Sequence, residues 1–167
     1  MKNNKGFSLV ELIIVIAIMA ILVGVMAPQL IKYIEKTNVS ADAQFCDSVK
    51  MAFMYSALDP SVVSADDSSE QQIEDLMDGT VWTTNTTVAD SEFTEAVKET
   101  LGFDVFSTTA CREKMKSTPA KSSGVLSCQV IDGAIFVWID HSDASGKKND
   151  YTAASASDLA NGVIYVD

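Results

Sequence analysis

One carboxylate in this chain lies where a charge is costly. Glu11 stands at the edge of a long apolar stretch, because residues 12–31 carry no formally charged side chain. A helix over this range is about 30 Å long at about 1.5 Å per residue, which matches the hydrocarbon core of a bilayer. An ionisable side chain at such a position normally has a partner of opposite charge. The chemistry indicated is therefore an ion pair between Glu11 and a cationic group in or beside a membrane.

The apolar stretch differs from a cleaved secretory signal. Such a signal has a small-residue A-x-A site after its apolar region, whereas Met26-Ala27-Pro28-Gln29 has a proline where cleavage is awkward. Lys2 and Lys5 precede the stretch, and by the positive-inside rule they favour the cytoplasmic side. The sequence therefore predicts a retained membrane span with the C-terminal part of the chain outside.

The residues that lead to Glu11 form a motif. The segment Lys5-Gly6-Phe7-Ser8-Leu9-Val10-Glu11 has a basic leader ending in Gly, then an aromatic residue, then a Glu four places later. It resembles the class III signal of type IV pilins and pseudopilins. The resemblance implies that a prepilin peptidase cuts between Gly6 and Phe7, and that the new amine of Phe7 is N-methylated.

On this resemblance the chain has three parts. Residues 1–6 are a leader peptide, and residues 7–31 are a transmembrane helix that becomes part of the filament core. Residues 32–167 are a globular pilin head that includes the C-terminal half of the same long helix. The head is long enough to bury a core of its own.

The spacing between Phe7 and Glu11 has a physical reason. After cleavage Phe7 carries a cationic amine, and a helix N-terminus adds about half a positive charge. Glu11 lies one turn along, so it can pair with the amine of its own chain or of the next subunit. In the family the glutamate neutralises the neighbouring subunit's amine during assembly, and the resemblance gives this role to Glu11. A glutamate that reaches the lipid headgroups without a partner is the alternative.

Two helix-weakening residues act on one turn of the span. Pro28 lacks an N–H, and its ring would clash with the carbonyl of Gly24, four residues earlier. The pair predicts a kink or a local melt. The resemblance implies that the segment from Gly24 to Pro28 can unwind when subunits pack into a filament.

The remaining sequence predicts an α+β head. Helical spacing continues to about Ala57, where Asp59-Pro60 predicts a stop. A buried stripe of this helix is predicted to pack on a sheet, and it comprises Ile31, Ile34, Ala41, Phe45, Val49, Ala52 and Phe53. Residues 61–85 are expected to form a loop with one short helix at 69–77. A further helix is expected between an N-cap at Asp90-Ser91 and a stop at Gly102.

The strand signals come late in the chain. Residues 125–131 and 134–140 flank Asp132-Gly133, which predicts an antiparallel hairpin with a type I′ turn. A third strand is expected at 163–166, after Asn161-Gly162. The fold class is thus a long N-terminal helix packed on a small antiparallel sheet, similar to type IV pilins.

Composition limits the functions of the head. The formal net charge is −11, which argues against nucleic-acid binding or anionic-membrane binding by the head as a whole. No G-x-S-x-G, P-loop or H-E-x-x-H motif occurs, and the chain has 1 histidine. We therefore expect no enzyme activity and no cofactor.

One local cluster is basic: Arg112, Lys114, Lys116 and Lys121 surround a lone Glu113. One interpretation is an exposed basic face. A sharper hypothesis is a subunit contact with the acidic region Asp66 to Asp78 of a neighbouring head, because heads of like charge repel when stacked. DNA capture by the same cluster is a weaker version.

The 3 cysteines are an odd number for an exported chain. We expect a disulfide between Cys111 and Cys128, which would close a modest loop, with Cys46 left buried on the long helix. A zinc site of the three cysteines and His141 is the alternative.

Acidic residues near the C-terminus are weak calcium candidates: Asp140, Asp143 and Asp150, with Gly146 among them. Major pseudopilins bind calcium in a C-terminal loop, but the spacing here does not fit an EF-hand. Solvated surface carboxylates are the simpler interpretation, and no metal site is assigned. A calcium-dependent rise in melting temperature, lost on replacing these aspartates, would be needed to support one.

The sequence thus favours a structural subunit of an extracellular type IV pilus. Its expected partners are copies of itself in a helical filament, the prepilin peptidase, the pilus assembly platform and, before assembly, the inner (cytoplasmic) membrane. The alternatives are a pseudopilin of a type II secretion or DNA-uptake system, and a minor pilin that acts as a tip adhesin.

Overall fold

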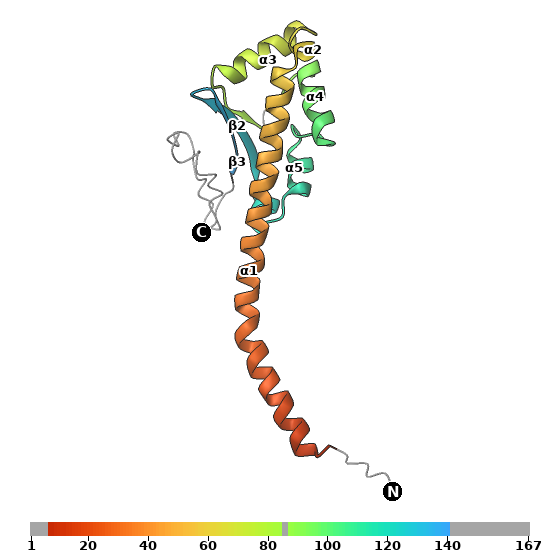
Figure 1. Cartoon of the computed structure of the whole chain (residues 1–167), viewed down its shortest axis with the longest axis vertical. Coiled ribbons are helices and arrows are strands. Elements are labelled where there is room, and N and C mark those ends of the chain that lie inside the picture. The colour runs from red at the N-terminus through yellow and green to blue at the C-terminus, as the bar shows by residue number, and fades with distance from the viewer. Residues whose placement is uncertain (1–6, 85–86, 141–167) are drawn as a thin grey trace. The chain divides into compact units, whose positions relative to one another are not determined.

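The computed structural model describes residues 7–84 and 87–140. The chain divides into two compact units, Met1–Thr37 (unit 1) and Asn38–Asp167 (unit 2). The elements are α1 (Leu9–Leu58), α2 (Pro60–Val63), α3 (Asp67–Met77), β1 (Trp82–Thr83), α4 (Glu92–Leu101), α5 (Thr108–Lys114), α6 (Thr118–Ser123), β2 (Val125–Ile131) and β3 (Ala134–Asp140) (Figure 1).

Helix α1 begins in unit 1 and is unbroken through Gly24 and Pro28. The local melt predicted at this turn is therefore absent from the structure. A proline removes one backbone donor and leaves the other hydrogen bonds of the helix available, and the flanking apolar residues are good helix formers. The unwinding implied for a packed filament is a property of the assembly and stays a prediction.

The sheet of unit 2 has the order β1-β2-β3, and both pairs are antiparallel. The β2–β3 hairpin is confirmed with the predicted bounds, and Val125 pairs with Asp140 at its open end. At the turn, φ is 52° at Asp132 and 78° at Gly133, as a type I′ turn requires. The third strand of the described sheet is β1, which the sequence analysis missed, whereas the strand expected at 163–166 lies outside the described residues.

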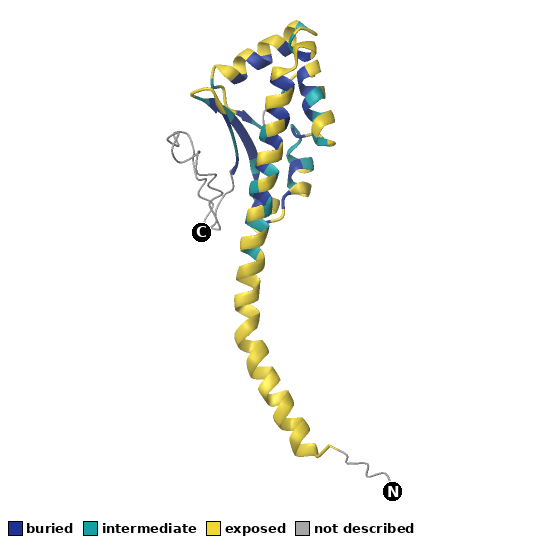
Figure 2. Cartoon of the chain, in the orientation of Figure 1, coloured by how far each residue is buried: buried dark blue, intermediate teal, exposed yellow. Residues whose placement is uncertain are grey.

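Helix α1 contributes its buried face to the core of unit 2 (Figure 2). Val49, Ala52 and Phe53 are buried as predicted, and the Phe53 ring meets Trp82 and Phe93 edge to face. The predicted stripe was wrong at its N-terminal end, where Ile31 and Ile34 are exposed. Both lie in unit 1, so they are outside the core that the sheet and the other helices form. The fold is α+β and pilin-like, with the long helix packed on a three-stranded antiparallel sheet.

Two short helices follow the sequence signals closely. Helix α4 has Ser91 as N-cap in a capping box with Thr94, and it ends at Gly102 in the left-handed region. Helix α3 starts at Asp67, two positions before the predicted start, because the Asp66 carboxylate caps it. The short helices α2, α5 and α6 were not predicted.

Gly124 is required at the start of β2. A Cβ added there would clash with the Ala120 carbonyl oxygen and lie 2.9 Å from Met115 Sδ. We expect Gly124→Ala to lower the free energy of unfolding by about 2–3 kcal/mol, because overpacking of a closed site forces its neighbours to shift. Denaturant unfolding of the detergent-solubilised chain measures it. Gly102→Ala is the control, since nothing lies within 4 Å there and only the left-handed backbone costs about 1 kcal/mol.

Candidate processing and assembly site

The N-terminus of α1 is capped by the side chains of Ser8 and Glu11. The Ser8 backbone N–H donates to Glu11 Oε2 at 2.8 Å, and the Val10 N–H donates to Ser8 Oγ at 3.4 Å. The spacing Ser8-x-x-Glu11 is the sequence signature of a capping box, and the structure forms the half of it in which Glu11 accepts from the N-cap N–H. This cap was not predicted. The carboxylate of Glu11 therefore turns back toward the start of the helix and away from the apolar stretch that follows.

This orientation brings Glu11 to the predicted cleavage point. Gly6 lies outside the described residues, whereas Phe7 is described and is 92% exposed. The nitrogen of Phe7, which cleavage would convert to an amine, belongs to the residue directly before the N–H that Glu11 accepts. The geometry can thus hold an anion beside a new cationic terminus.

The rest of α1 in unit 1 presents apolar side chains in every direction. The large apolar residues between Leu9 and Ile31 are between 49% and 74% exposed. This helix is long and apolar enough to cross a membrane. Such a surface is not stable in water, so it requires lipid or other copies of the helix around it.

Asp42 anchors α1 inside unit 2. Its carboxylate is fully buried and accepts three hydrogen bonds, from the Lys116 N–H, the Ser117 N–H (2.9 Å) and the Ser117 hydroxyl. These donors lie between the end of α5 and the first turn of α6. The burial of Asp42 is not evident from local sequence, because its hydrogen-bond partners are more than 70 residues away in the chain.

The four basic candidates differ in their surroundings. Arg112 is half-buried, and its Nε donates to the Gly124 carbonyl at 2.8 Å. Lys114 is exposed, with its ammonium 5.4 Å from the centre of the Phe103 ring. Lys116 and Lys121 are exposed. Three of the four are therefore available on the surface, and Arg112 supports the fold.

All three cysteines are free, buried thiols, so the predicted Cys111–Cys128 disulfide is not formed in this structure. Cys111 instead donates its thiol hydrogen to the Val105 carbonyl at 3.0 Å, and Cys128 lies on β2 opposite Val137 and Trp82. Burial raises the pKa of the Cys111 and Cys128 thiols to about 12. Burial also raises the pKa of Cys46, with a further contribution from the nearby Asp42 carboxylate.

These raised pKa values predict a loss of stability at alkaline pH. Thiols ionise near pH 8.5 in the unfolded chain and remain neutral in the folded one, so their contribution to the free energy of unfolding is constant below that pH. Above it, this contribution falls as the pH rises toward 12, by about 1.4 kcal/mol per pH unit for each thiol. Urea unfolding between pH 8 and 10.5 measures this slope. A variant with all three cysteines replaced by alanine should have a smaller slope; an equal slope would contradict the prediction.

The residues that the structure describes hold no group of three His, Cys, Asp or Glu side chains able to bind a metal. Of the calcium candidates, Asp143 and Asp150 lie outside the described residues, as does His141, the proposed fourth zinc ligand. The side chain of Asp140 is likewise not described. The calcium and zinc hypotheses stay untested.

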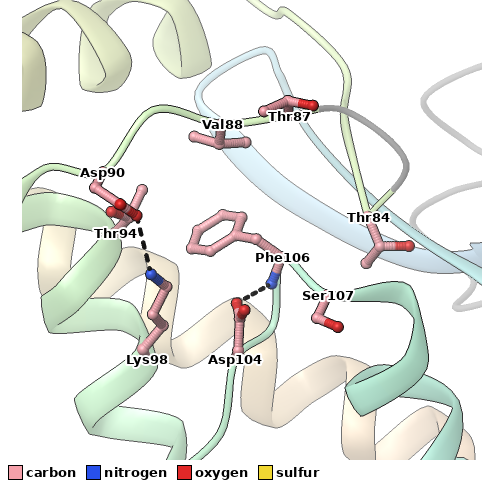
Figure 3. A pocket seen from close by; sticks show the side chains of 9 residues that line it. All are labelled: Thr84, Thr87, Val88, Asp90, Thr94, Lys98, Asp104, Phe106 and Ser107. Carbon is pink, nitrogen blue, oxygen red and sulfur yellow. Dashed lines mark hydrogen bonds and ion pairs between the residues drawn. The ribbon is translucent and has the colours of Figure 1, made fainter.

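One polar recess of about 340 Å³ lies in unit 2 between α4 and the segment before α5. Its charged groups already have internal partners (Figure 3). The Lys98 ammonium lies 2.8 Å from Glu95 and 3.4 Å from Asp90, and Asp104 accepts the Phe106 N–H at 3.0 Å. Among the described residues that line the recess, no nucleophile is paired with a general base.

The comparisons with known proteins agree with the N-terminal geometry. Residues 1–27 match the family model of the prokaryotic N-terminal methylation motif. The chain is 46% identical over 56 residues to the type IV wide pilus major component PilA4 of Thermus thermophilus. That alignment covers 33% of this chain and 43% of the relative's own length. No solved structure gives a significant match.

The Glu11 cap, the exposed apolar helix and the methylation motif all lie in the N-terminal part of the chain. The matched methylation motif lies at the start of the chain, and an α+β head includes the C-terminal half of the long helix that follows it. This chain carries a prokaryotic N-terminal methylation motif at residues 1–27 and is homologous, over a third of its length, to a type IV pilin.

Proposed function

We propose that this protein is a structural subunit of an extracellular type IV pilus. The observation that carries the proposal is the exposed apolar helix of unit 1 directly behind a methylation motif. A soluble protein does not expose such a helix, and an ordinary membrane anchor does not need a glutamate that turns back onto its own N-terminus. The similarity to a major pilus component supports the same role.

The proposed life cycle has two stages. The precursor is inserted in the cytoplasmic membrane through α1, with the head outside, and a prepilin peptidase removes the residues up to Gly6. The assembly platform then extracts the subunit, and the apolar helices of many copies pack together in the filament core. Glu11 neutralises the amine of Phe7 in a neighbouring copy during this transfer. The protein acts by assembly and does not turn over a substrate.

Two measurements test the proposal. Mass analysis of the membrane-bound protein should show a mature chain that begins at N-methylated Phe7; an intact Met1 would contradict processing. Surface filaments sheared from the cells should contain the protein along their length and in large amount. A pseudopilin would stay with the cell, and a tip adhesin would be scarce in the sheared fraction, so the same fractionation separates these alternatives.

A further inference from the structure

Unit 2 has charges of opposite sign at opposite ends. One end is the acidic edge, formed by exposed carboxylates on and just after α3: Asp67, Glu70, Glu74, Asp75 and Asp78. The other end is the basic edge, formed by the exposed ammonium groups of Lys114, Lys116 and Lys121. Each head therefore has one acidic and one basic end, although the net charge of the chain is negative.

The lengths of α1 and β2 show how far apart these edges lie. Asp42 on α1 binds the backbone N–H of Lys116, next to the basic edge, and α1 ends at Leu58, where α2 leads into α3 (Figure 1). At 1.5 Å per residue the helix rises about 24 Å between Asp42 and Leu58. Strand β2 gives a second measure, because it runs from the end of α6 to Gln129, whose Nε2 donates to the Gly79 carbonyl after α3. The two edges thus lie at opposite ends of unit 2.

Neither edge is neutralised within the described residues. Within residues 7–84 and 87–140, no ion pair joins a carboxylate of the acidic edge or an ammonium group of the basic edge to another side chain. The sequence has no Lys or Arg between Lys50 and Lys98, so the acidic edge has no cation near it in the chain. On the basic edge, Lys114 lies over the Phe103 ring, and Lys116 and Lys121 are exposed. Each edge is therefore available to a partner of opposite charge.

We propose that the basic edge of one head docks on the acidic edge of the next copy in the filament. The inference rests on the proposed pilus function, because copies whose α1 helices run parallel and are shifted along that axis bring unlike ends together. Heads of net negative charge repel one another at long range, and complementary edges offset this repulsion where the copies touch and fix their register. The partner is thus a second copy of this chain.

Charge reversal in the full chain tests the interface. We expect Lys116→Glu with Lys121→Glu to reduce sheared filaments roughly tenfold, and Glu70→Lys with Glu74→Lys to do the same, since each places like charges in contact. The four substitutions together should restore filaments to near the wild-type amount. Equal melting temperatures of the detergent-solubilised variants verify that folding is unchanged, as expected for exposed side chains.

A matched control separates local from global charge. Asp47→Lys with Glu99→Lys changes the net charge as much as the acidic-edge variant does, at exposed positions outside both edges, and should assemble normally. If both charge-reversal double variants formed normal filaments, or if the fourfold variant did not recover filaments, the proposed interface would be wrong while the proposed function would stand. Absence of filaments from the wild type would overturn the proposed function and the interface with it.

Discussion

The Asp42→Ala substitution is expected to lower the free energy of unfolding by about 3–5 kcal/mol. The carboxylate accepts hydrogen bonds from two backbone N–H groups and one hydroxyl at the junction of α5 and α6. Alanine would leave these donors without their acceptor at a position where both Asp42 and Ser117 are buried. An unsatisfied buried donor costs about 1–3 kcal/mol, so the effect exceeds that of an ordinary surface change. Denaturant unfolding of the detergent-solubilised chain measures it.

Two further variants show whether the hydrogen bonds are responsible. Asp47→Ala, at an exposed position on the same helix, should change stability by less than about 0.5 kcal/mol. Ser117→Ala removes only the hydroxyl donor, so it should cost about 1–2 kcal/mol. If Asp42→Ala were no more harmful than Asp47→Ala, the anchoring role of Asp42 would be wrong.

The second large effect is expected at Glu11. We predict that Glu11→Gln leaves insertion and cleavage intact but reduces filaments about 100-fold or more. In the proposed assembly, glutamine keeps the size and the capping hydrogen bond of Glu11 but leaves the amine of Phe7 uncompensated in an apolar core. Removing one partner of a buried ion pair costs about 3–5 kcal/mol, and each 1.4 kcal/mol is a factor of ten.

The readout separates assembly from processing. Mass analysis of the membrane fraction should find mature Glu11→Gln protein, while the sheared fraction should be nearly empty of it. Asp47→Asn, which also removes one exposed carboxylate, should give wild-type amounts in both fractions. Normal filaments from Glu11→Gln would show that the carboxylate has no role in assembly.

Features encoded within a few residues could be predicted from the sequence. The long apolar helix, the motif that ends at Glu11 and the end of α1 are set by composition and spacing along one segment. The hairpin follows from Asp132-Gly133, whose positive φ angles few residue pairs adopt. The capping box of α4 and its stop at Gly102 are also local. Each prediction held because the deciding interactions join residues fewer than about five positions apart.

The tertiary structure alone decided which distant groups meet. Nothing in the local sequence distinguishes Asp42 from the exposed carboxylates, yet it is the fully buried acceptor for Lys116 and Ser117. The sequence predicted a disulfide between two cysteines and one free thiol, yet all three cysteines are buried free thiols in this structure. Strand β1 has only two residues, too few for a periodic pattern, and it exists because β2 offers a free edge.

The N-terminal motif and apolar helix were thus determined by the sequence itself, since their chemistry depends on spacing within one turn and on the absence of charge. The polarity of the head was decided only by the fold. The carboxylates on α3 and the lysines between Lys114 and Lys121 lie at opposite ends of unit 2, because α1 and β2 run between these two regions. No local sequence pattern predicts this separation, because it depends on tertiary contacts between residues that are far apart in the chain.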